Sequence, residues 1–260
     1  MASNTDWTGK VVVVTGGAMG IGAATAQLFG EHGAKVVVAD PSGAAEETVA
    51  KIKGKGSDAL HVRGDVSSED DVKALAKAAV DKFGRIDGLV NNAGIMYRHD
   101  TIEDWPMDEI RRVLNVNLLA LFLTSYTLGP ILAKDGGGSI VNISSVGGIM
   151  PVVYSPVYAA AKAGVLGLTR SVAPSFGARG VRVNAMLPNF VDTPMTADSP
   201  SRKLMPMLDP IDIARGVLHI ASDPALQGAF FTVSRDEAGK RTLSRVSDSP
   251  SFTPAENQPF

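Results

Sequence analysis

Two tyrosines and a lysine in the stretch YSPVYAAAK, residues 154–162, are placed for acid–base chemistry. If the stretch is helical, Tyr154, Tyr158 and Lys162 lie along one face, because residues four apart are neighbours on a helix. A free phenol has a pKa of about 10, and a nearby cation lowers that pKa because it favours the phenolate. The spacing alone does not show which of the two tyrosines has its pKa lowered by Lys162.

A glycine-rich segment, TGGAMGIG at residues 15–22, follows the apolar run VVVVT. Glycines permit a tight turn and a close approach of the backbone, and the start of the following helix offers free N–H groups to a pyrophosphate. The place of the segment after the first expected strand favours a dinucleotide site over a purely structural turn. The residues expected to contact the cofactor here are Gly16, Met19, Gly20, Ile21 and Gly22.

Asp40 ends the second expected strand, at the place where an acid would hold the 2′ hydroxyl of the adenosine ribose. A carboxylate there repels the 2′ phosphate of NADP. No Lys or Arg stands in the glycine loop or in Pro41–Gly43, so the pattern favours NAD. Asp65, after the third strand, either accepts a hydrogen bond from the adenine amino group or caps the helix that begins near SSED.

The elements that carry these residues alternate along the chain. Apolar, β-branched runs predict strands near 11–15, 35–40, 59–66, 86–94, 139–145, 181–187 and 228–233. Helical patterns lie between them, including a long helix over 107–133 and another over 157–177. Continuous apolar strands alternating with helices indicate a parallel sheet covered on both faces. We expect one domain over residues 1–233 and a polar extension, rich in Ser and Pro, over 234–260.

The composition excludes several other classes of protein. The chain has 260 residues, of which 45% are hydrophobic and 20% charged, and its formal net charge is −2, so no bulk attraction to nucleic acid or acidic membranes is implied. It contains no cysteine, and its four histidines are scattered, so neither disulfides nor a metal site are expected. The polar start and the absence of an obvious membrane-spanning run lead us to expect a cytoplasmic protein.

Together, the glycine loop, NNAG at 91–94, Ser145 and Tyr158-x-x-x-Lys162 resemble the short-chain dehydrogenase/reductase family, over about residues 8–233. The resemblance implies a three-layer, Rossmann-like, doubly wound sheet of seven parallel strands in the order 3-2-1-4-5-6-7. It also implies hydride transfer between a nicotinamide and an alcohol or carbonyl carbon.

The resemblance implies roles for particular residues. It selects Tyr158 as the general base or acid, because the family's lysine follows that tyrosine by four. Ser145 would donate a hydrogen bond to the substrate oxygen, and Lys162 would hold the nicotinamide ribose and lower the pKa of Tyr158 together with the oxidised nicotinamide. The main chain of Asn117 would hold a water linking Lys162 to solvent. The remaining residues implied at the cofactor are Val66, Asn92, Ala93, Gly94, Pro188, Val191 and Thr193.

The substrate side is expected to include Met96, Tyr154, Asn189 and Met195 beside Ser145. Asn189 stands where the family usually has glycine. The methionines favour an apolar secondary alcohol or ketone, although these side chains could equally serve only to pack the surrounding loops.

The leading hypothesis is therefore an NAD-dependent alcohol dehydrogenase. The alternatives are an NADPH-dependent carbonyl reductase and a non-catalytic nicotinamide-binding regulator of the same fold. By resemblance and from the apolar helices 107–133 and 157–177, we expect a homotetramer. The tail is expected to dock in part, over Leu243 to Phe252, near the edge strand GAFFTV.

Overall fold

One mixed sheet organises the molecule. The structure, a computed structural model, describes residues 5–199, 202, 207–236 and 238–246. Within them, eight strands pair in the order β3-β2-β1-β4-β5-β6-β7-β8, and only the last pair is antiparallel. The strands are β1 (Val11–Thr15), β2 (Lys35–Ala39), β3 (Ala59–Val62), β4 (Gly88–Asn91), β5 (Gly138–Ile143), β6 (Val181–Met186), β7 (Phe230–Arg235) and β8 (Arg241–Arg245).

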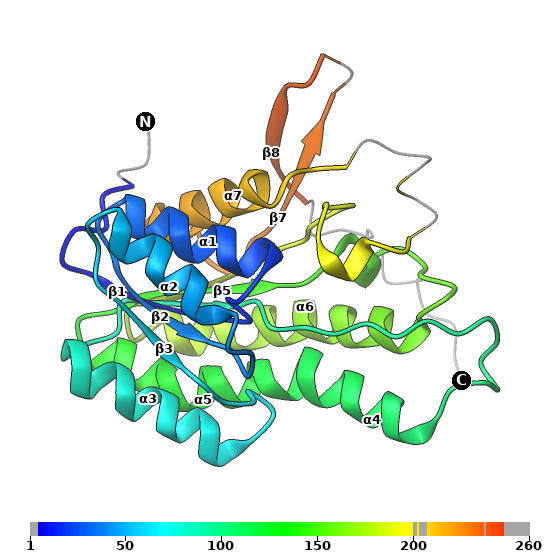
Figure 1. The fold of residues 1–260 in the computed structure, drawn as a ribbon, viewed down its shortest axis with the longest axis horizontal. Coiled ribbons are helices and arrows are strands. Elements are labelled where there is room, and N and C mark those ends of the chain that lie inside the picture. The colour runs from blue at the N-terminus through cyan, green and yellow to red at the C-terminus, as the bar shows by residue number, and fades with distance from the viewer. Residues whose placement is uncertain (1–4, 200–201, 203–206, 237, 247–260) are drawn as a thin grey trace, which may run out of the picture.

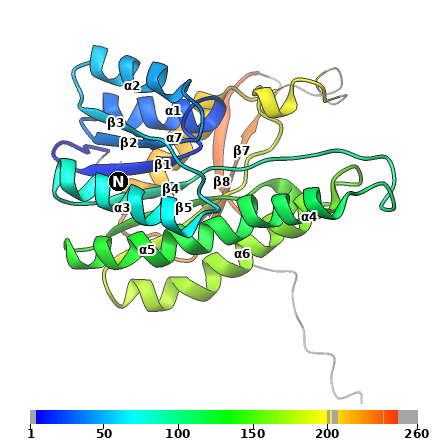
Figure 2. The same ribbon diagram turned by 60° about the horizontal axis from the view of Figure 1, so that its bottom comes forward.

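Helices cover both faces of this sheet, as Figures 1 and 2 show. The α-helices are α1 (Gly20–Glu31), α2 (Ala45–Gly54), α3 (Glu69–Phe83), α4 (Met107–Leu114), α5 (Ala120–Lys134), α6 (Pro156–Gly177) and α7 (Pro210–Ser222). Short segments η1 (Asn115–Leu119), η2 (Val146–Gly148) and η3 (Pro194–Thr196) lie between them. Helices α1, α2 and α7 form one layer, and α3, α4, α5 and α6 form the other. The three-layer, Rossmann-like fold expected from the sequence is confirmed.

Alternate side chains of the buried strands fill the two layers of core. Val12 and Val14 of β1 face the cluster that includes Phe29 of α1, whereas Val11 and Val13 face the cluster under α3 and α5. Successive side chains of a strand point to opposite faces, so a strand covered on both sides must be apolar throughout. This is why the central strands read as uninterrupted runs of valine.

The chain order places a crevice between β1 and β4. From β1 the chain moves outward to β2 and β3, and it then returns to β4 on the other side of β1. The loops that leave the carboxyl ends of β1 and β4 therefore diverge, and ligands of open parallel sheets bind at such a switch point. Here the two loops carry the glycine-rich turn and Asn92–Gly94.

The long helix expected over 107–133 is interrupted by a π-helical turn. The structure divides this segment into α4, the π segment η1 and α5. Asn117 lies in η1 and is completely buried. Single π turns within α-helices are rare, and they occur frequently at functional sites.

The expectation of seven strands is wrong, because an eighth strand follows β7. Strand β8 pairs with β7 in antiparallel register, with Val233 opposite Leu243. Leu243 packs against the core, whereas its neighbours along β8 are exposed. The strand GAFFTV is consequently not the edge of the sheet. Of the expected docking segment Leu243 to Phe252, residues 247–252 lie outside the described residues.

The expectation that no segment is long and apolar enough to cross a membrane is wrong for the helical segment Met107–Lys134. By length and composition alone, its 28 residues would suffice. In the fold, however, half of its most apolar window is buried, and α5 packs against β4, β5 and α3. These contacts are those of a core helix.

Candidate active site

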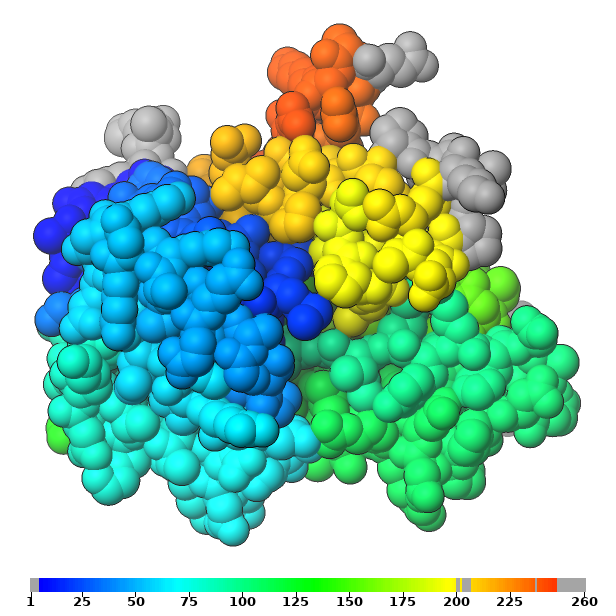
Figure 3. All heavy atoms as spheres, viewed as in Figure 1, coloured from blue at the N-terminus to red at the C-terminus, as the bar shows by residue number. Residues whose placement is uncertain are grey.

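A cavity of about 600 Å³ opens at the carboxyl ends of the parallel strands. In Figure 3, the blue start of α1, the yellow segment around η3 and green segments of the chain meet on one face of the molecule. Every site residue expected from the sequence lines this cavity except Asn117. These lining residues are Gly16, Met19, Gly20, Ile21, Gly22, Asp40, Asp65, Val66, Asn92, Ala93, Gly94, Met96, Ser145, Tyr154, Tyr158, Lys162, Pro188, Asn189, Val191, Thr193 and Met195.

The glycine turn fits a pyrophosphate. Helix α1 begins after Met19 with no side-chain cap and no acid in its first turn, so its first N–H groups remain available to an anion. Gly16 and Gly20 have positive φ angles of 65° and 56°. A Cβ atom on Gly22 would lie 2.1 Å from the carbonyl oxygen of Gly16. At Gly16 and Gly22 the turn therefore leaves no room for a side chain, so its backbone can approach a ligand closely.

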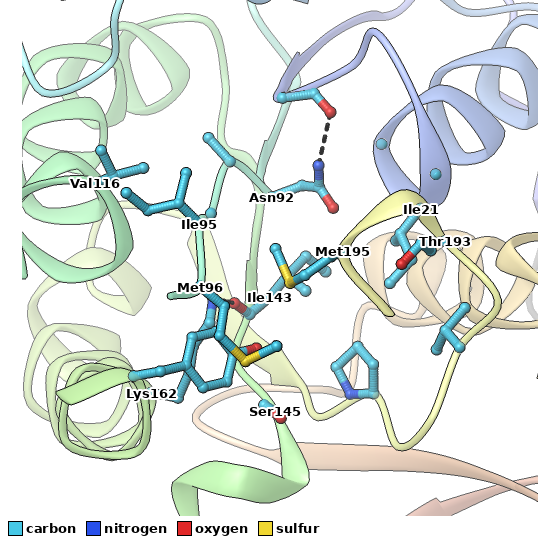
Figure 4. A pocket seen from close by; sticks show the side chains of 18 of the residues that line it. Ile21, Asn92, Ile95, Met96, Val116, Ile143, Ser145, Lys162, Thr193 and Met195 are labelled. Atoms are coloured by element: carbon cyan, nitrogen blue, oxygen red, sulfur yellow. Dashed lines mark hydrogen bonds between the residues drawn. The ribbon is translucent and has the colours of Figure 1, made fainter. Parts of the chain in front are cut away.

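Asn92 ties the two diverging loops together. Its Nδ2 donates hydrogen bonds to the carbonyl oxygens of Thr15 and Gly16, each at 2.9 Å, and Figure 4 shows this side chain between the loops. The Thr15 hydroxyl in turn accepts from the amides of Asn92 and Ala93, at 3.0 and 3.1 Å. These bonds fix the glycine turn against the loop after β4.

Asp40 is held by backbone amides at the end of β2. One carboxylate oxygen accepts from the Ala18 amide at 3.0 Å, and the other accepts from the Ser42 amide at 2.9 Å. The side chain is almost buried but lines the cavity. Arg63 approaches from the end of β3 and donates to the Pro41 carbonyl at 3.1 Å. A guanidinium therefore stands near the ribose end, although no basic residue adjoins Asp40 in the sequence.

Asp65 forms an ion pair with Arg112, from α4, at 2.8 Å. Its other oxygen accepts from the Ser67 amide at 2.9 Å and the Ser67 hydroxyl at 2.7 Å. Although burial opposes it, the hydrogen bonds from Ser67 and Arg112 lower the pKa of Asp65, so the carboxylate is ionised. Ser68, not Asp65, supplies the cap of α3, and Asp65 lines the cavity, so its expected contact with adenine stays a prediction.

Tyr158 and Ser145 meet on one wall of the cavity. Part of the Tyr158 ring remains accessible through the cavity, yet the surrounding protein raises the pKa of Tyr158 to about 12 by burial, against an opposing hydrogen bond with Ser145. The Ser145 oxygen accepts from the Gly147 amide at 3.0 Å, so its O–H is the group that can donate to the Tyr158 oxygen or to a ligand beside it. Without a cofactor, desolvation therefore outweighs the hydrogen bond from Ser145; the lowered pKa expected with an oxidised nicotinamide beside the ring stays a prediction.

Lys162 is buried beside the Tyr158 ring. Its Nζ donates to the Ile143 carbonyl at 2.8 Å and lies 5.6 Å from the centre of that ring. Burial lowers the pKa of Lys162 to about 8. Gly94 keeps the space in front of the Lys162 Nζ open. A Cβ atom on Gly94 would lie 3.6 Å from this Nζ and 2.7 Å from Asn117 Oδ1.

Asn117 lies behind the cavity wall and supports it. Its Oδ1 accepts from the Ile95 amide at 3.1 Å, and its Nδ2 donates to the Ile95 carbonyl at 2.8 Å. The same Nδ2 donates to the Val113 carbonyl at 3.0 Å. The side chain is thus fully used in holding the loop after β4, so any direct contribution to the reacting groups must come from its main chain.

Apolar side chains form the substrate end. Met96, Met195 and Ser145 surround the same space in Figure 4, and Val152 and Tyr154 complete this wall. Tyr154 precedes α6, which begins at Pro156, so it is not on the helix face of Tyr158. Asn189 lines the cavity in the loop after β6, where its side chain adds a polar group.

Among the residues near the cavity that sequence reasoning missed, three have large side chains. Arg112 and Phe190 line the cavity. Arg98 stands at the rim, in contact with Tyr154 and Met195. No sequence pattern singles out Arg112, which reaches the cavity from α4. The other two depend on contacts between distant loops.

Comparisons with known proteins point to one family. Residues 10–204 match the family described as short chain dehydrogenase. A cis-4-hydroxycyclohexanecarboxylate dehydrogenase of Sinomonas cyclohexanicum is 40% identical, with 86% of this chain and 94% of the relative covered. A 2,5-dichloro-2,5-cyclohexadiene-1,4-diol dehydrogenase of Sphingobium indicum is 42% identical, with 84% and 90% covered. A 3-oxoacyl-(acyl-carrier-protein) reductase of Synechocystis sp. is 40% identical, with 87% and 96% covered.

Solved structures agree with the sequence comparison. The crystal structure of levodione reductase matches with a TM-score of 0.82 at 32% identity, over 87% of this chain and 96% of that chain. A short-chain type dehydrogenase/reductase from Mycobacterium marinum matches with a TM-score of 0.84 at 28% identity, over 88% and 95%. The likeness therefore extends over most of both chains.

Proposed function

The chain belongs to the short-chain dehydrogenase family, and we propose that it is an NAD-preferring dehydrogenase of a cyclic secondary alcohol. Membership makes it an oxidoreductase that acts on alcohols and ketones. The observation that carries the finer proposal is the meeting of Ser145, Tyr158 and Lys162 on one wall of a cavity whose far end holds Asp40 and the open glycine turn.

We assign the proton transfer to Tyr158. Its phenol accepts the hydroxyl proton of an alcohol, or returns a proton to the oxygen of a ketone. In the substrate complex, Ser145 donates its O–H to the same substrate oxygen, where it stabilises developing negative charge. A bound nicotinamide would supply the hydride chemistry, accepting a hydride from the carbinol carbon or giving one back.

The acid–base state of Tyr158 depends on what is bound beside it. With a pKa of about 12, the phenol is protonated at neutral pH and acts as a proton donor. A positive charge placed near the ring favours the phenolate and lowers that pKa. Lys162 provides part of this charge from 5.6 Å, and an oxidised cofactor would bring the rest. Tyr158 thus becomes a base mainly in the complex that oxidises alcohols.

The preference for NAD rests on Asp40. Two backbone amides hold its carboxylate at the ribose end, where it can accept from ribose hydroxyls and repels a 2′ phosphate. Arg63 favours the rival, an NADPH-dependent carbonyl reductase, because its guanidinium lies near Pro41. We give Asp40 more weight because it lines the cavity, which Arg63 does not.

A ring-shaped substrate is proposed from the cavity and from two relatives. Both the hydroxycyclohexanecarboxylate and the cyclohexadienediol dehydrogenases are named for alcohols on six-membered rings. The wall of Met96, Val152, Tyr154 and Met195 offers this chain an apolar surface for such a ring. Methionine side chains adapt to irregular apolar shapes.

Assembly and location are also proposed. Phe122 and Tyr126 stack on each other on α5 and are 50% and 72% exposed, an arrangement that a second subunit would cover, so we propose a homotetramer. Light scattering at micromolar concentration tests this, and a monomer would contradict it. The absence of cysteine fits a reducing compartment, and we propose the cytoplasm.

The function is tested by oxidation of cyclohexanol, with 2-hexanol as the open-chain comparison, followed by NADH absorbance. We expect cyclohexanol to be preferred with NAD. Tyr158→Phe should lower kcat by about 100- to 10,000-fold and leave NADH binding nearly intact, because the ring is kept and only the proton carrier is lost. Tyr154→Phe is the matched control and should be much milder. Equal damage by both variants would refute the assignment.

A further inference from the structure

Arg98 is a half-buried cation that contacts two of the residues lining the cavity, without lining it itself. It follows β4 in the chain, and its guanidinium lies 5.3 Å from the centre of the Tyr154 ring. Its Nη2 donates a hydrogen bond of 3.4 Å to the Met195 carbonyl. Tyr154 and Met195 both line the cavity, in segments far apart in the sequence. Arg98 therefore spans the rim between two substrate-side walls.

The backbone on both sides of Arg98 is fixed to the start of α6. The Ser155 hydroxyl, in a completely buried residue, donates to the Tyr97 carbonyl at 2.8 Å. The His99 amide donates to the Tyr154 carbonyl at 3.2 Å. Helix α6 also carries Tyr158, so these bonds hold Arg98 in a fixed relation to the proposed proton-transfer residue.

The charge of Arg98 is not neutralised by any carboxylate in the part of the chain that the structure describes. Glu109 pairs with His99 at 2.7 Å, and Asp192 pairs with Arg202 at 2.7 Å, so neither of these carboxylates is paired with Arg98. A guanidinium has five N–H donors, and the long bond to Met195 uses one of them. The other arginine at the cavity, Arg112, is paired with Asp65.

We propose that Arg98 binds a carboxylate group of the substrate, remote from the carbon that is oxidised. A planar guanidinium matches a carboxylate with two parallel hydrogen bonds, and the cation–π contact with Tyr154 helps to hold the Arg98 guanidinium in place. The substrate class is then a hydroxy- or oxocycloalkane carboxylate, with the ring against the apolar wall and the acid at the rim. This inference rests on the proposed function and narrows its substrate.

Turnover of a matched pair of substrates tests the inference. The pair is 4-hydroxycyclohexanecarboxylate and cyclohexanol, assayed with wild type, Arg98→Gln, Arg98→Lys and the control Arg111→Gln. Arg111 is on the exposed surface, where it pairs with Asp108. Arg98→Gln should lower kcat/KM for the carboxylate by about 10- to 100-fold, mainly through KM, and leave cyclohexanol within about twofold. Arg98→Lys should recover part of the loss, and Arg111→Gln should change neither substrate.

Binding gives a readout that does not need turnover. Quenching of NADH fluorescence in the enzyme–NADH complex measures the binding of cyclohexanecarboxylate and of the uncharged cyclohexanecarboxamide. Wild type should bind the carboxylate about 10-fold or more tightly than the amide, and Arg98→Gln should bind the two equally.

Three results would overturn the inference. The first is a wild type that does not distinguish carboxylate from amide. The second is an Arg98→Gln variant that loses activity equally toward both alcohols, which would give Arg98 only a structural role. The third is an Arg98→Gln variant that keeps the wild-type preference for the carboxylate. In each case, if the wild type still oxidises cyclohexanol, the proposed function stands. Conversely, a wild type that does not prefer cyclohexanol to 2-hexanol would refute the proposed function, but not the proposed carboxylate contact of Arg98.

Discussion

Replacing Lys162 by methionine should change how the stability of the cofactor-free protein depends on pH. Burial lowers the pKa of Lys162 from 10.5 to about 8. Between these values the unfolded chain binds a proton that the folded chain does not. Wild-type stability should therefore rise with pH across this window, whereas below about pH 8 the folded protein carries the full cost of a buried charge. Lys162→Met fills the space without that charge.

The size of the effect follows from the shift. At about 1.36 kcal/mol per pKa unit, a shift from 10.5 to about 8 corresponds to about 3.4 kcal/mol. Methionine also loses the hydrogen bond to the Ile143 carbonyl, which contributes about 1.5–3 kcal/mol for a charged donor. At pH 7 the variant should be as stable as wild type or more so by up to about 2 kcal/mol. From pH 7 to pH 10 the free energy of unfolding of the variant, relative to that of wild type, should fall by roughly 2.5 kcal/mol. The lost hydrogen bond does not alter this change, because its contribution is constant over the range.

The assay is urea unfolding of both proteins without cofactor, at one protein concentration, at unit intervals from pH 7 to pH 10. Tyr158, with its pKa raised to about 12, adds a decrease in stability only near pH 10 and above, and it is present in both proteins. Parallel stability curves would refute the reasoning, because they would mean that the pKa of Lys162 is the same in the folded and unfolded chains.

Three further changes probe the cofactor site and the added strand. Asp40→Ala should erode the preference for NAD over NADP by about 10-fold or more, since the charge that repels a 2′ phosphate is removed from the ribose end; an unchanged ratio of kcat/KM values would contradict this. Gly22→Ala places a methyl group 2.1 Å from a main-chain carbonyl oxygen of the glycine turn and should weaken NADH binding at least about 10-fold. The control Gly43→Ala, at a position with open space around it, should leave NADH binding unchanged. Equal Kd values of the two variants in fluorescence titration would contradict the assignment of the glycine turn as the pyrophosphate site. Ending the chain after Arg235 removes β8 and the burial of Leu243, worth about 1.5–3 kcal/mol, so calorimetry should show a Tm lower by several degrees; an identical Tm would mean that β8 contributes nothing.

The elements that could be predicted are those whose signal is local. The valine runs of β1 and β2 are continuous because both faces of these strands are covered. The glycine turn is recognisable because the spacing of its glycines is the one that lets the backbone approach a phosphate. Strand β8 gave no such signal. Its five residues, RTLSR, contain one apolar side chain, Leu243, because an outer strand with one packed residue has almost the composition of a loop.

The parts of the site that could not be predicted depend on contacts between residues far apart in the sequence and on how deeply the fold buries each side chain. Arg98 and Met195 are nearly a hundred positions apart and meet only when the loops after β4 and β6 close over the cavity. The effect of burial on the Tyr158 pKa could not be predicted for a related reason. A sequence shows that a lysine is four residues away, but it does not show how much water the folded protein removes from the phenol.

The π turn at η1 has a consequence for insertions and deletions. A π turn contains one residue more than the α-helical turn that it replaces, so the segment from α4 to α5 can be regarded as an α-helix with one residue inserted at Asn115–Leu119. Deleting one residue there would restore regular α-helical geometry at little cost to the helix itself. It would also remove the widened turn that holds Asn117, and with it the position from which the Asn117 side chain donates to the Ile95 carbonyl. In this chain, a length change that a helix tolerates is one that the active site does not.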